Sequence, residues 1–548
     1  MADSFPFHIG LHTIAAPAIA LFGYLAIQGI WRLYFSPIAK FPGPRLAALT
    51  YWYEFYYDVI LRGKYLFKME ELHAQYGPIV RINPHELSVR DPEFFETLYA
   101  GSGHKRERDP WHTAGLGLGG SLLDTVPHDL HRKRRAALSP FFSKAYTKRM
   151  LPVVEERVDA LMSQLVKLKN AEAPVNFLHA LSAFSNDVIM EYCFGKSSHR
   201  VEAPHFDPAQ HNLSLDSAKA TNINRNFPFL PKTLLALPNS IAVLIGGGLA
   251  AVAQQKEIFN ADIEDVKNPS SKPTTDRETI FQTLLESDLP ASEKRNERLI
   301  NEAIVLIGAG SHTVAWALTV ATYHILSSPQ ILQAIKQELS AAKRRNGGED
   351  LTLPELEKLP YLTAVIKEGL RLSYGASVRL PRVCPDATLR YKDWVIPAGT
   401  AVSVSTVMMH HDETIFPDSK AFVPERWLED KSGRLDKYMA AFSGGSRICL
   451  GINLAWAELY LCLGGVYSTF GGKGYSEEGD EGILELFETD VGDVEICRDF
   501  VFCDCQGRFG GCEGQDKKLR CQPSLIVKVS INKQRLLKYL KMGSNIAK

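Results

Sequence analysis

The chain has 548 residues, 45% of them hydrophobic, and its 62 lysines and arginines balance 62 aspartates and glutamates. This length favours two or three domains, although a single large helical enzyme is also compatible with it. Because the net charge is zero, there is no global electrostatic attraction to nucleic acid, and nucleic acid is not an expected partner. Nine cysteines, four of them scattered singly, argue against a disulfide framework and favour a reducing compartment.

The first predicted element is a hydrophobic N-terminal helix. Residues 14–31 carry no charged side chain, and an apolar run of this length lies at the lower edge of what spans a bilayer. Arg32, Lys40 and Arg45 follow the run, whereas the segment before it is slightly acidic, so the positive-inside rule places the rest of the chain in the cytosol. We expect residues 1–36 to be an uncleaved single-pass anchor. A cleaved secretory signal and a buried core helix are the alternatives.

A proline-rich connector, residues 37–46, follows the anchor, and its FPGPR sequence predicts a stiff extended segment. The periodicity of the next 450 or so residues is mostly that of amphipathic helices. The elements expected there are a helix over 65–76, a hairpin around residues 83–84, a helical region up to about residue 345, and short strands near 378–383, 389–396 and 400–405. The pattern predicts a mainly α-helical body with small β-sheets over residues 47–495.

Three polar patterns interrupt this helical body. Residues 131–135 read HRKRR, which is compatible with a solvated basic helix face or a docking surface for an acidic protein. Residues 308–313 read GAGSHT inside a long apolar helix. A glycine there costs roughly 1 kcal/mol relative to alanine, so two of them predict a functional groove or close helix packing. Glu368 and Arg371 lie at i, i+3 on one helix face, the spacing of an ordinary ion pair.

The most specific pattern is FSGGSRICLG at residues 442–451. A glycine-rich loop lets the backbone lie close to a flat ligand and present N–H groups to a sulfur atom. Phe442 can pack over such a ligand, and Arg447 can pair with an anionic group. A helix expected from Ile452 places its positive end beside Cys449, which favours the thiolate. Taken alone, Cys449 would be interpreted as a buried structural cysteine.

The decapeptide resembles the haem-binding signature of the cytochromes P-450, and the three earlier patterns resemble segments of that family in the expected order. The resemblance implies the cytochrome P-450 fold and a haem b cofactor with Cys449 as the axial ligand of the iron. It also implies insertion of one oxygen atom from O₂ into a hydrophobic small molecule, because a thiolate ligand favours O–O cleavage. The implied electron donor is a separate NADPH-cytochrome reductase, with cytochrome b5 as an optional second donor.

The same resemblance implies roles for the other positions. Thr313 matches the family's threonine that hydrogen-bonds the oxygen ligand, and His312, where an acid is usual, would relay protons. Glu368 and Arg371 would bind Arg426, from a later Pro-Glu-Arg segment, in a buried structural triad. The residues expected to hold the haem are Phe442, Arg447, His131 (where the family usually has tryptophan), Arg135 and Arg382.

Within the family, the amino-acid sequence of the N-terminal part is similar to that of fungal secondary-metabolism enzymes of the trichodiene oxygenase group. The expected substrate is therefore a terpenoid or polyketide intermediate. The expected location is the endoplasmic reticulum membrane, with the catalytic domain in the cytosol. Two alternatives differ in kind: a haem-thiolate isomerase or dehydratase, which the threonine at position 313 disfavours, and a non-catalytic haem protein disabled by its C-terminus.

The C-terminal segment, residues 496–548, does not resemble the family. Five of the nine cysteines lie there without the paired CxxC spacing of common zinc sites, although zinc binding is an alternative. The closing hairpin strands of the family are not recognisable after Cys497. We therefore expect an atypical Cys-rich tail, of the kind that an altered reading frame or an unspliced exon would produce.

Overall fold

Helices with apolar faces make up most of the chain. The computed structural model describes residues 11–169, 174–230, 247–268, 277–500, 502–504 and 525–531. Its α-helices are α1 Leu11–Ile30, α2 Arg45–Leu49, α3 Trp52–Phe55, α4 Tyr65–Tyr76, α5 Phe95–Leu98, α6 Pro110–Ala114, α7 His128–Leu138, α8 Lys144–Leu168, α9 Phe177–Phe194, α10 Ala209–Asn226, α13 Gly247–Lys267, α14 Ile280–Glu286, α15 Asn296–Ser327, α16 Pro329–Arg345, α17 Leu353–Leu356, α18 Pro360–Ser373, α19 Thr406–His410, α20 Glu425–Glu429 and α21 Ile452–Thr469.

The strands form small sheets beside the helices. They are β1 Ile79–Arg81, β2 Glu86–Val89, β3 Glu107–Arg108, β4 Pro174–Asn176, β5 Arg382–Val383, β6 Leu389–Tyr391, β7 Trp394–Ile396, β8 Ala401–Ser403, β9 Phe470–Gly472, β10 Gly482–Leu486, β11 Arg498–Phe500, β12 Phe502–Asp504 and β13 Ile526–Ser530. One sheet has the order β1-β2-β8-β5-β3 and another β4-β13-β10-β9, while β6-β7 and β11-β12 are two-stranded. Among the strands that the structure describes, only the β2–β8 and β9–β10 pairs are parallel.

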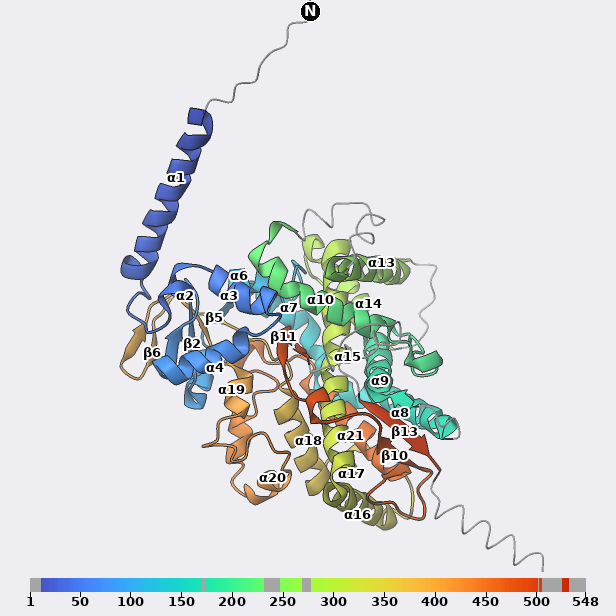
Figure 1. Ribbon diagram of the computed structural model, residues 1–548. Helices are drawn as coiled ribbons and strands as arrows, with labels where there is room; N and C mark the ends of the chain where they lie inside the picture. The colour runs from blue at the N-terminus through green and yellow to red at the C-terminus, as the bar shows by residue number, and fades with distance from the viewer. Residues whose placement is uncertain are drawn as a thin grey trace, which may run out of the picture.

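The long helix α15 runs through the middle of the molecule (Figure 1). It contacts α9, α13, α18 and α21, and most of its side chains are buried. A helix that is apolar nearly all round needs such neighbours on several sides. This arrangement places residues 308–313, near the middle of α15, inside the protein and close to the other core helices.

Most elements expected from the sequence are present. The helix over residues 65–76 is α4, and the hairpin around residues 83–84 is β1 and β2, with Ile79 opposite Val89. The strands expected between residues 378 and 405 are β5 to β8. The fold is mainly α-helical with small β-sheets, as predicted. A polar stretch of the sequence covers residues 266–277, and its residues 269–276 lie outside the described part of the chain.

The C-terminal segment corrects one expectation. Strands do occur after Cys497: β11 and β12 pair as a hairpin, and β13 pairs antiparallel with both β10 and β4. Leu525, Val527 and Val529 are buried, and the residues between them are not, which is the period of a half-buried strand. This short alternation is hard to recognise beside the Cys-rich sequence that precedes it. Cys505, Cys512 and Cys521 lie outside the described residues.

The N-terminal helix α1 continues into the π-helical turn η1 (Trp31–Phe35) and stands away from the body (Figure 1). Among the described residues, two helices are long and apolar enough to cross a membrane. One is α15, whose most apolar window is 67% buried; the other is Ala16–Phe35, which is 6% buried. Since α15 is covered by other helices, the N-terminal helix is the candidate membrane span.

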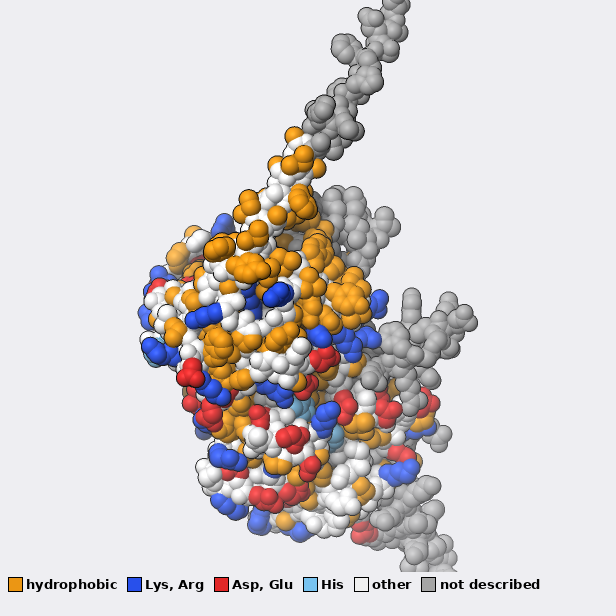
Figure 2. Space-filling view, turned by 60° about the vertical axis from the view of Figure 1, so that its left-hand side comes forward, with side chains coloured by type: hydrophobic (Ala, Val, Ile, Leu, Met, Phe, Trp, Pro, Cys, Tyr) orange, Lys and Arg blue, Asp and Glu red, His pale blue; other side chains and the backbone are white. Residues whose placement is uncertain are grey.

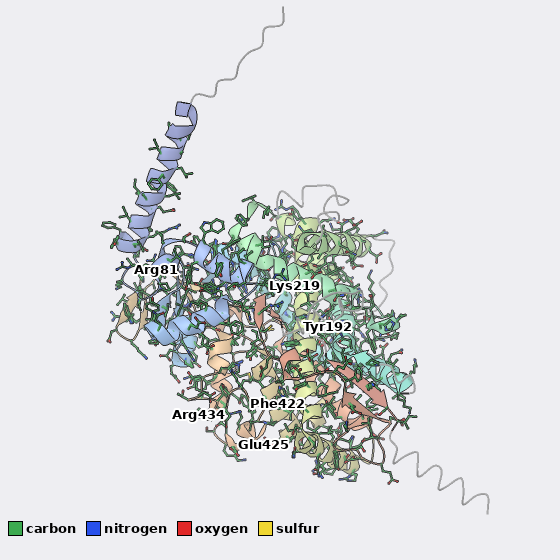
Figure 3. All side chains as sticks on the ribbon, in the orientation of Figure 1. Arg81, Tyr192, Lys219, Phe422, Glu425 and Arg434 are labelled. Atoms are coloured by element: carbon green, nitrogen blue, oxygen red, sulfur yellow. The ribbon has the colours of Figure 1, made fainter. Side chains whose placement is uncertain are left out.

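The base of this helix is fixed to the body by buried hydrogen bonds. Arg81 donates to the carbonyl oxygen of Arg32 at 2.8 Å and to that of Pro84 at 2.8 Å, and it is labelled near the foot of α1 in Figure 3. Around the same foot, Figure 2 shows a broad hydrophobic surface. Its exposed large side chains on α3 and the following turn η2 (Tyr56–Ile60) are Trp52, Tyr56 and Ile60.

Candidate functional site

A large cavity lies between α15 and α21. Ala309, Gly310 and Thr313 of α15 line it, as do Cys449 and Leu454 around the start of α21. The cavity has a volume of about 320 Å³, and most of its lining is apolar. A hydrophobic cavity with a few polar groups is typical of a small-molecule or cofactor site.

The loop before α21 brings Cys449 to the cavity. The Cys449 N–H donates to the carbonyl oxygen of Phe442 at 2.9 Å, which closes the loop. Gly445 has φ +67°, and a Cβ there would lie 2.2 Å from the carbonyl oxygens of Tyr99 and Ala100. Only glycine fits this position, since it tolerates positive φ and has no side chain. The glycine-rich sequence therefore lets the loop pack on the residues after α5 and point Cys449 into the cavity.

The surroundings of Cys449 act on the pKa of its thiol in opposite directions. The thiol opens onto the cavity, but protein surrounds it on its other sides. Burial raises the pKa of the Cys449 thiol, while the backbone N–H of Gly451 and the charge of Arg135 lower it, and burial prevails. The predicted influence of the start of α21 is thus present, but in the protein alone it does not outweigh desolvation. A positively charged ligand atom at the sulfur would favour the thiolate.

A cluster of cationic and imidazole side chains lies along one side of the cavity. Arg108, His131, Arg135 and Arg447 line it, and Arg382 is buried opposite Arg108 in the β3–β5 pair. Burial and the neighbouring arginines lower the pKa of Arg447 and of Arg108 to about 9. Burial and the charges of Arg447 and Arg135 lower the pKa of His131 to about 3. Glu302 and Glu458 also line the cavity, but among the described residues no carboxylate forms a salt bridge with a member of the cluster.

These residues fit the anionic edge of a haem. Nη2 of Arg382 is buried and has no hydrogen-bond partner among the described residues, and the neighbouring guanidiniums repel one another. Two carboxylates of a ligand would accept a hydrogen bond from Arg382 Nη2 and would offset the repulsion between the guanidiniums. Arg447 donates to the carbonyl oxygens of Arg106, Thr125 and Val126, and these three hydrogen bonds fix its guanidinium in place.

Helix α15 presents Thr313 but not His312 to the cavity. The Thr313 hydroxyl donates to the carbonyl oxygen of Ala309 at 2.8 Å and faces the open space. His312 is not among the residues lining the cavity; its ring lies 5.2 Å from that of His211 on α10, and burial lowers its pKa to about 4. Successive helix residues point about 100° apart. The structure therefore does not bring His312 to the site expected for a proton relay.

The two glycines of the same segment behave differently. A Cβ on Gly310 would lie 2.8 Å from the Ile189 side chain of α9, whereas Gly308 has only a distant neighbour, Ser214, at 3.8 Å. Gly310 thus both lines the cavity and allows α15 and α9 to pack closely. The close helix packing expected from the sequence is therefore present at Gly310, and the functional groove stays a prediction.

The predicted ion triad is present. Glu368 accepts from Arg371 Nη2 at 2.8 Å and from Arg426 Nε at 3.1 Å, and both Glu368 and Arg371 are fully buried. Burial alone would raise the pKa of Glu368, but the bonds and charge of Arg371 hold it below its ordinary value. The Trp427 indole N–H also donates to Glu368 at 2.9 Å, a contact that the sequence pattern did not predict.

Arg108 was also missed by the sequence argument. It lies outside the four recognised patterns, in a two-residue strand, and only the pairing of β3 with β5 brings it beside Arg382. Phe442 lines the cavity as expected, with its ring 6.3 Å from that of Trp456. Phe442, Arg447, His131 and Arg135, predicted to contact the haem, all line the cavity, whereas Arg382 is buried beside the lining residue Arg108 and does not line it itself.

Residues 42–487 match the family model for cytochrome P450. Cytochrome P450 monooxygenase tpcC of Cochliobolus heterostrophus is 42% identical over 497 residues, covering 89% of this chain and 94% of the relative. Cytochrome P450 monooxygenase astB of Talaromyces wortmannii is 41% identical, covering 88% and 95%. Tryptophan 6-hydroxylase fscE of Fusarium equiseti is 38% identical, covering 86% and 90%.

A mainly helical body with a cysteine and a threonine facing one apolar cavity is the architecture of a haem-dependent oxidoreductase. The chain belongs to the cytochrome P450 family. The relatives are fungal monooxygenases of secondary metabolism, and this protein is a cytochrome P450 monooxygenase. Membership implies a haem iron cofactor, a redox partner that supplies electrons and a hydrophobic substrate.

Proposed function

We propose that the protein binds haem b through Cys449 and inserts one oxygen atom from O₂ into a terpenoid or polyketide intermediate of fungal secondary metabolism. The observation that carries the proposal is the apolar cavity with Cys449 at one side and Thr313 on the α15 wall. The bound haem supplies oxygen activation. The mainly apolar lining excludes water and orients a hydrophobic substrate by contact.

The cationic cluster is proposed to hold the haem by its propionates. His131, Arg135 and Arg447 reach the cavity directly, and Arg382 contributes its free buried N–H from behind. We add Arg108, which shares the cavity and the same mutual repulsion. Phe442 packs in the loop that carries Cys449 and would cover one face of the haem.

Thr313 is proposed to handle protons at the reacting centre. The Thr313 hydroxyl donates a hydrogen bond to the carbonyl oxygen of Ala309, and rotation about the Cα–Cβ bond would turn the hydroxyl towards a cavity ligand. His312 is not assigned to this role, because its ring faces His211 and not the cavity.

Location and partners follow from the N-terminal helix. We propose that Ala16–Phe35 anchors the protein in the endoplasmic reticulum membrane with the catalytic body in the cytosol, where NADPH-cytochrome reductase, and optionally cytochrome b5, would supply electrons. The exposed apolar residues at the foot of the helix support contact with the same membrane. No partner surface for nucleic acid is proposed.

Replacement of the cysteine tests the proposal. Cys449→Ser should abolish the red-shifted absorption band of the reduced carbon-monoxide complex and all substrate oxidation, because an alcohol is a poor thiolate substitute. Cys462→Ser is the matched control: Cys462 is fully buried on α21, the helix that follows the Cys449 loop, and lies outside the cavity lining. A Cys449→Ser protein that kept both the band and turnover would refute the assignment.

The role of Thr313 has its own test. Thr313→Ala should still bind haem but release more peroxide per NADPH consumed, by roughly tenfold, because a positioned proton-handling group contributes about 10²-fold or more to a rate. Thr319→Ala is the control, since Thr319 makes the same bond to the residue four positions earlier, Ala315, at 2.7 Å but is buried away from the cavity. Equal coupling of NADPH use to product in wild type and Thr313→Ala would contradict the role.

A further inference from the structure

Two polar side chains from neighbouring helices, neither of them part of the cationic cluster, line the apolar cavity. His112 belongs to the short helix α6 and Thr221 to α10, and both line the cavity. Gly115, at the C-terminal end of α6, packs directly against α10. A Cβ on Gly115 would lie 2.8 Å from the Thr221 carbonyl oxygen and 3.1 Å from Cβ of Arg225. His112 is therefore held against α10, in a wall that is otherwise built mainly from apolar residues.

The hydrogen bond from Arg225 determines the tautomer of His112. Nη1 of Arg225 lies 3.1 Å from Nδ1 of His112, and a guanidinium has donors only. Nδ1 must therefore accept, and Nε2 carries the ring proton. Burial first, and then the charge of Arg225, lower the pKa of His112 well below its ordinary value, so the ring stays neutral. His112 is a fixed neutral N–H donor.

Arg225 is itself held on several sides. It donates to Asp58 at 3.0 Å and to Asn222 at 2.6 Å, and it pairs with Glu54 at 3.3 Å. Its guanidinium lies 5.0 Å from the Trp111 ring. These contacts come from α3, η2, α6 and α10, so the guanidinium cannot turn away without breaking a buried network.

The helix that carries His112 is also anchored. The side chain of Asp109 caps α6 by accepting from the His112 backbone N–H at 2.8 Å, and Trp111 stacks on Tyr51 with 4.8 Å between ring centroids. The imidazole is therefore fixed in position as well as in tautomer. Nε2 has no hydrogen-bond partner among the described residues, although His112 lines the cavity. A donor fixed in this way requires an acceptor from a cavity ligand.

We propose that His112 is a specificity-determining residue whose Nε2–H donates to a carbonyl or hydroxyl oxygen of the substrate, with Arg225 as its positioning residue. The inference rests on the proposed function, because it assigns the substrate class of the same cavity: an apolar skeleton that already carries one oxygen function. A carboxylate is disfavoured, since the two guanidiniums of the adjoining network, Arg225 and Arg379, already face the three carboxylates of Glu54, Asp58 and Glu86.

Iron-anchored ligands test this without knowledge of the natural substrate. The probes are N-alkylimidazoles of increasing chain length, each made with a terminal methyl ketone and with an isopropyl group of the same shape. The imidazole ligates the haem iron and shifts its absorption, so the dissociation constant is read by titration. In wild type, at the chain length that reaches His112, the ketone should bind about tenfold more tightly than its hydrocarbon partner.

Variants of His112 decide the assignment. His112→Phe should bring the ketone-to-hydrocarbon ratio to about one, whereas His112→Gln, which keeps a donor N–H and an acceptor for Arg225, should retain a several-fold preference. Leu116→Ala, on the same wall, should weaken both probes equally. A wild type that shows no ketone preference at any chain length, or a preference that survives His112→Phe, overturns the proposal. Absence of haem or of any imidazole shift in wild type would instead contradict the proposed function.

Arg225 is tested by the same ratio, which a purely structural role would not move. Arg225→Lys keeps a cationic donor for Nδ1 and should keep most of the ketone preference, whereas Arg225→Met should lose most of it while binding the hydrocarbon probe as before. If Arg225→Met does not load haem, the lysine variant decides alone. A lysine variant with haem and hydrocarbon binding intact but no ketone preference would show that the ammonium does not orient the ring.

Discussion

Glu368 and Glu54 are both fully buried carboxylates that bind two arginines each, but they belong to clusters of different construction. Glu368 binds Arg371 and Arg426, and all three lie on α18 or α20. Glu54 binds Arg379 at 2.5 Å and Arg225 at 3.3 Å, which come from a loop and from α10. The first cluster fixes two neighbouring helices, whereas the second connects segments spread over most of the chain.

The charge balance of the two clusters also differs. Around Glu368 one carboxylate faces two guanidiniums, and other N–H groups of these guanidiniums donate to the carbonyl oxygens of His410, Ser419, Ala421 and Pro417. In the second cluster Asp58 and Glu86 add to Glu54, so three carboxylates face two guanidiniums. Burial, opposed by Arg225 and reinforced by Glu54, raises the pKa of Asp58 to about 7. A buried cluster with surplus cation keeps its acid ionised, and one with surplus acid takes up a proton.

The largest expected effect is at the first cluster. Glu368→Ala leaves the guanidiniums of Arg371 and Arg426 buried without their carboxylate, and this should cost about 3–5 kcal/mol of unfolding free energy. Urea denaturation monitored by circular dichroism measures the change. Glu425→Ala is the control: Glu425 is exposed on α20, the helix that carries Arg426, and its loss should change stability by less than about 0.5 kcal/mol. Equal stability of the two variants would show that Glu368 does not carry the cluster.

The second cluster should respond to pH. Asp58 has a pKa of about 7 in the folded protein and an ordinary value of 3.8 when unfolded, so the folded state binds more protons between these values. By linkage, stability is greatest at low pH and falls as pH rises from about 4 to about 7, by about 2–4 kcal/mol in all. Asp58→Asn mimics the protonated form and should remove most of this slope. Asp129→Asn, at an exposed aspartate, should retain it.

The contribution of Asp58 is contradicted if wild type and Asp58→Asn lose stability in parallel between pH 5 and pH 7. Urea titrations at each pH, with the haem-loaded fraction measured alongside, separate protein unfolding from loss of cofactor. Glu54 should not contribute to this slope in the same direction, because Arg379 and Arg225 overcome its burial and hold its pKa below the ordinary value.

The same contrast explains what could be predicted from sequence. The Glu368 cluster follows from an i, i+3 pair and one short later motif, so local spacing and a resemblance were enough. Glu54, Glu86, Arg225 and Arg379 are separated by tens to hundreds of residues, and each alone is compatible with an exposed charge. Only the tertiary contacts among α3, β2, α10 and the loop before β5 bring them together.

The candidate site divides in the same way. The Cys449 loop and Thr313 were predictable, because a ten-residue motif and a helical periodicity define their surroundings. Arg108 was not, since its role depends on the pairing of β3 with β5. His312 was assigned from its neighbour Thr313, but adjacent helical residues face different directions, and its ring contacts His211. Motifs predict which residues matter more reliably than they predict which way a side chain points.

The smallest expected effect also comes from the Glu368 cluster. Trp427→Phe removes one indole N–H from a carboxylate that also accepts from Arg371, Arg426 and the Val423 backbone, so no oxygen of Glu368 is left without a donor. Hydrogen bonds to charged groups contribute about 1.5–3 kcal/mol, and a carboxylate with several donors should lose a value near the lower end. Trp394→Phe is the control, because this substitution removes the same side-chain volume from a tryptophan that is partly buried against Phe41.

The pH dependence of this small effect distinguishes the two clusters. The folded pKa of Glu368 is below its ordinary value of 4.5, so its stabilising contribution is complete above that value and is lost only as pH falls through the folded pKa. The difference in unfolding free energy between Trp427→Phe and Trp394→Phe should therefore be about 1.5 kcal/mol at pH 5 and the same at pH 8. A difference that changes between these pH values would mean that Glu368 titrates as Asp58 does. The surplus of guanidiniums would then not be what keeps a buried carboxylate ionised in this protein.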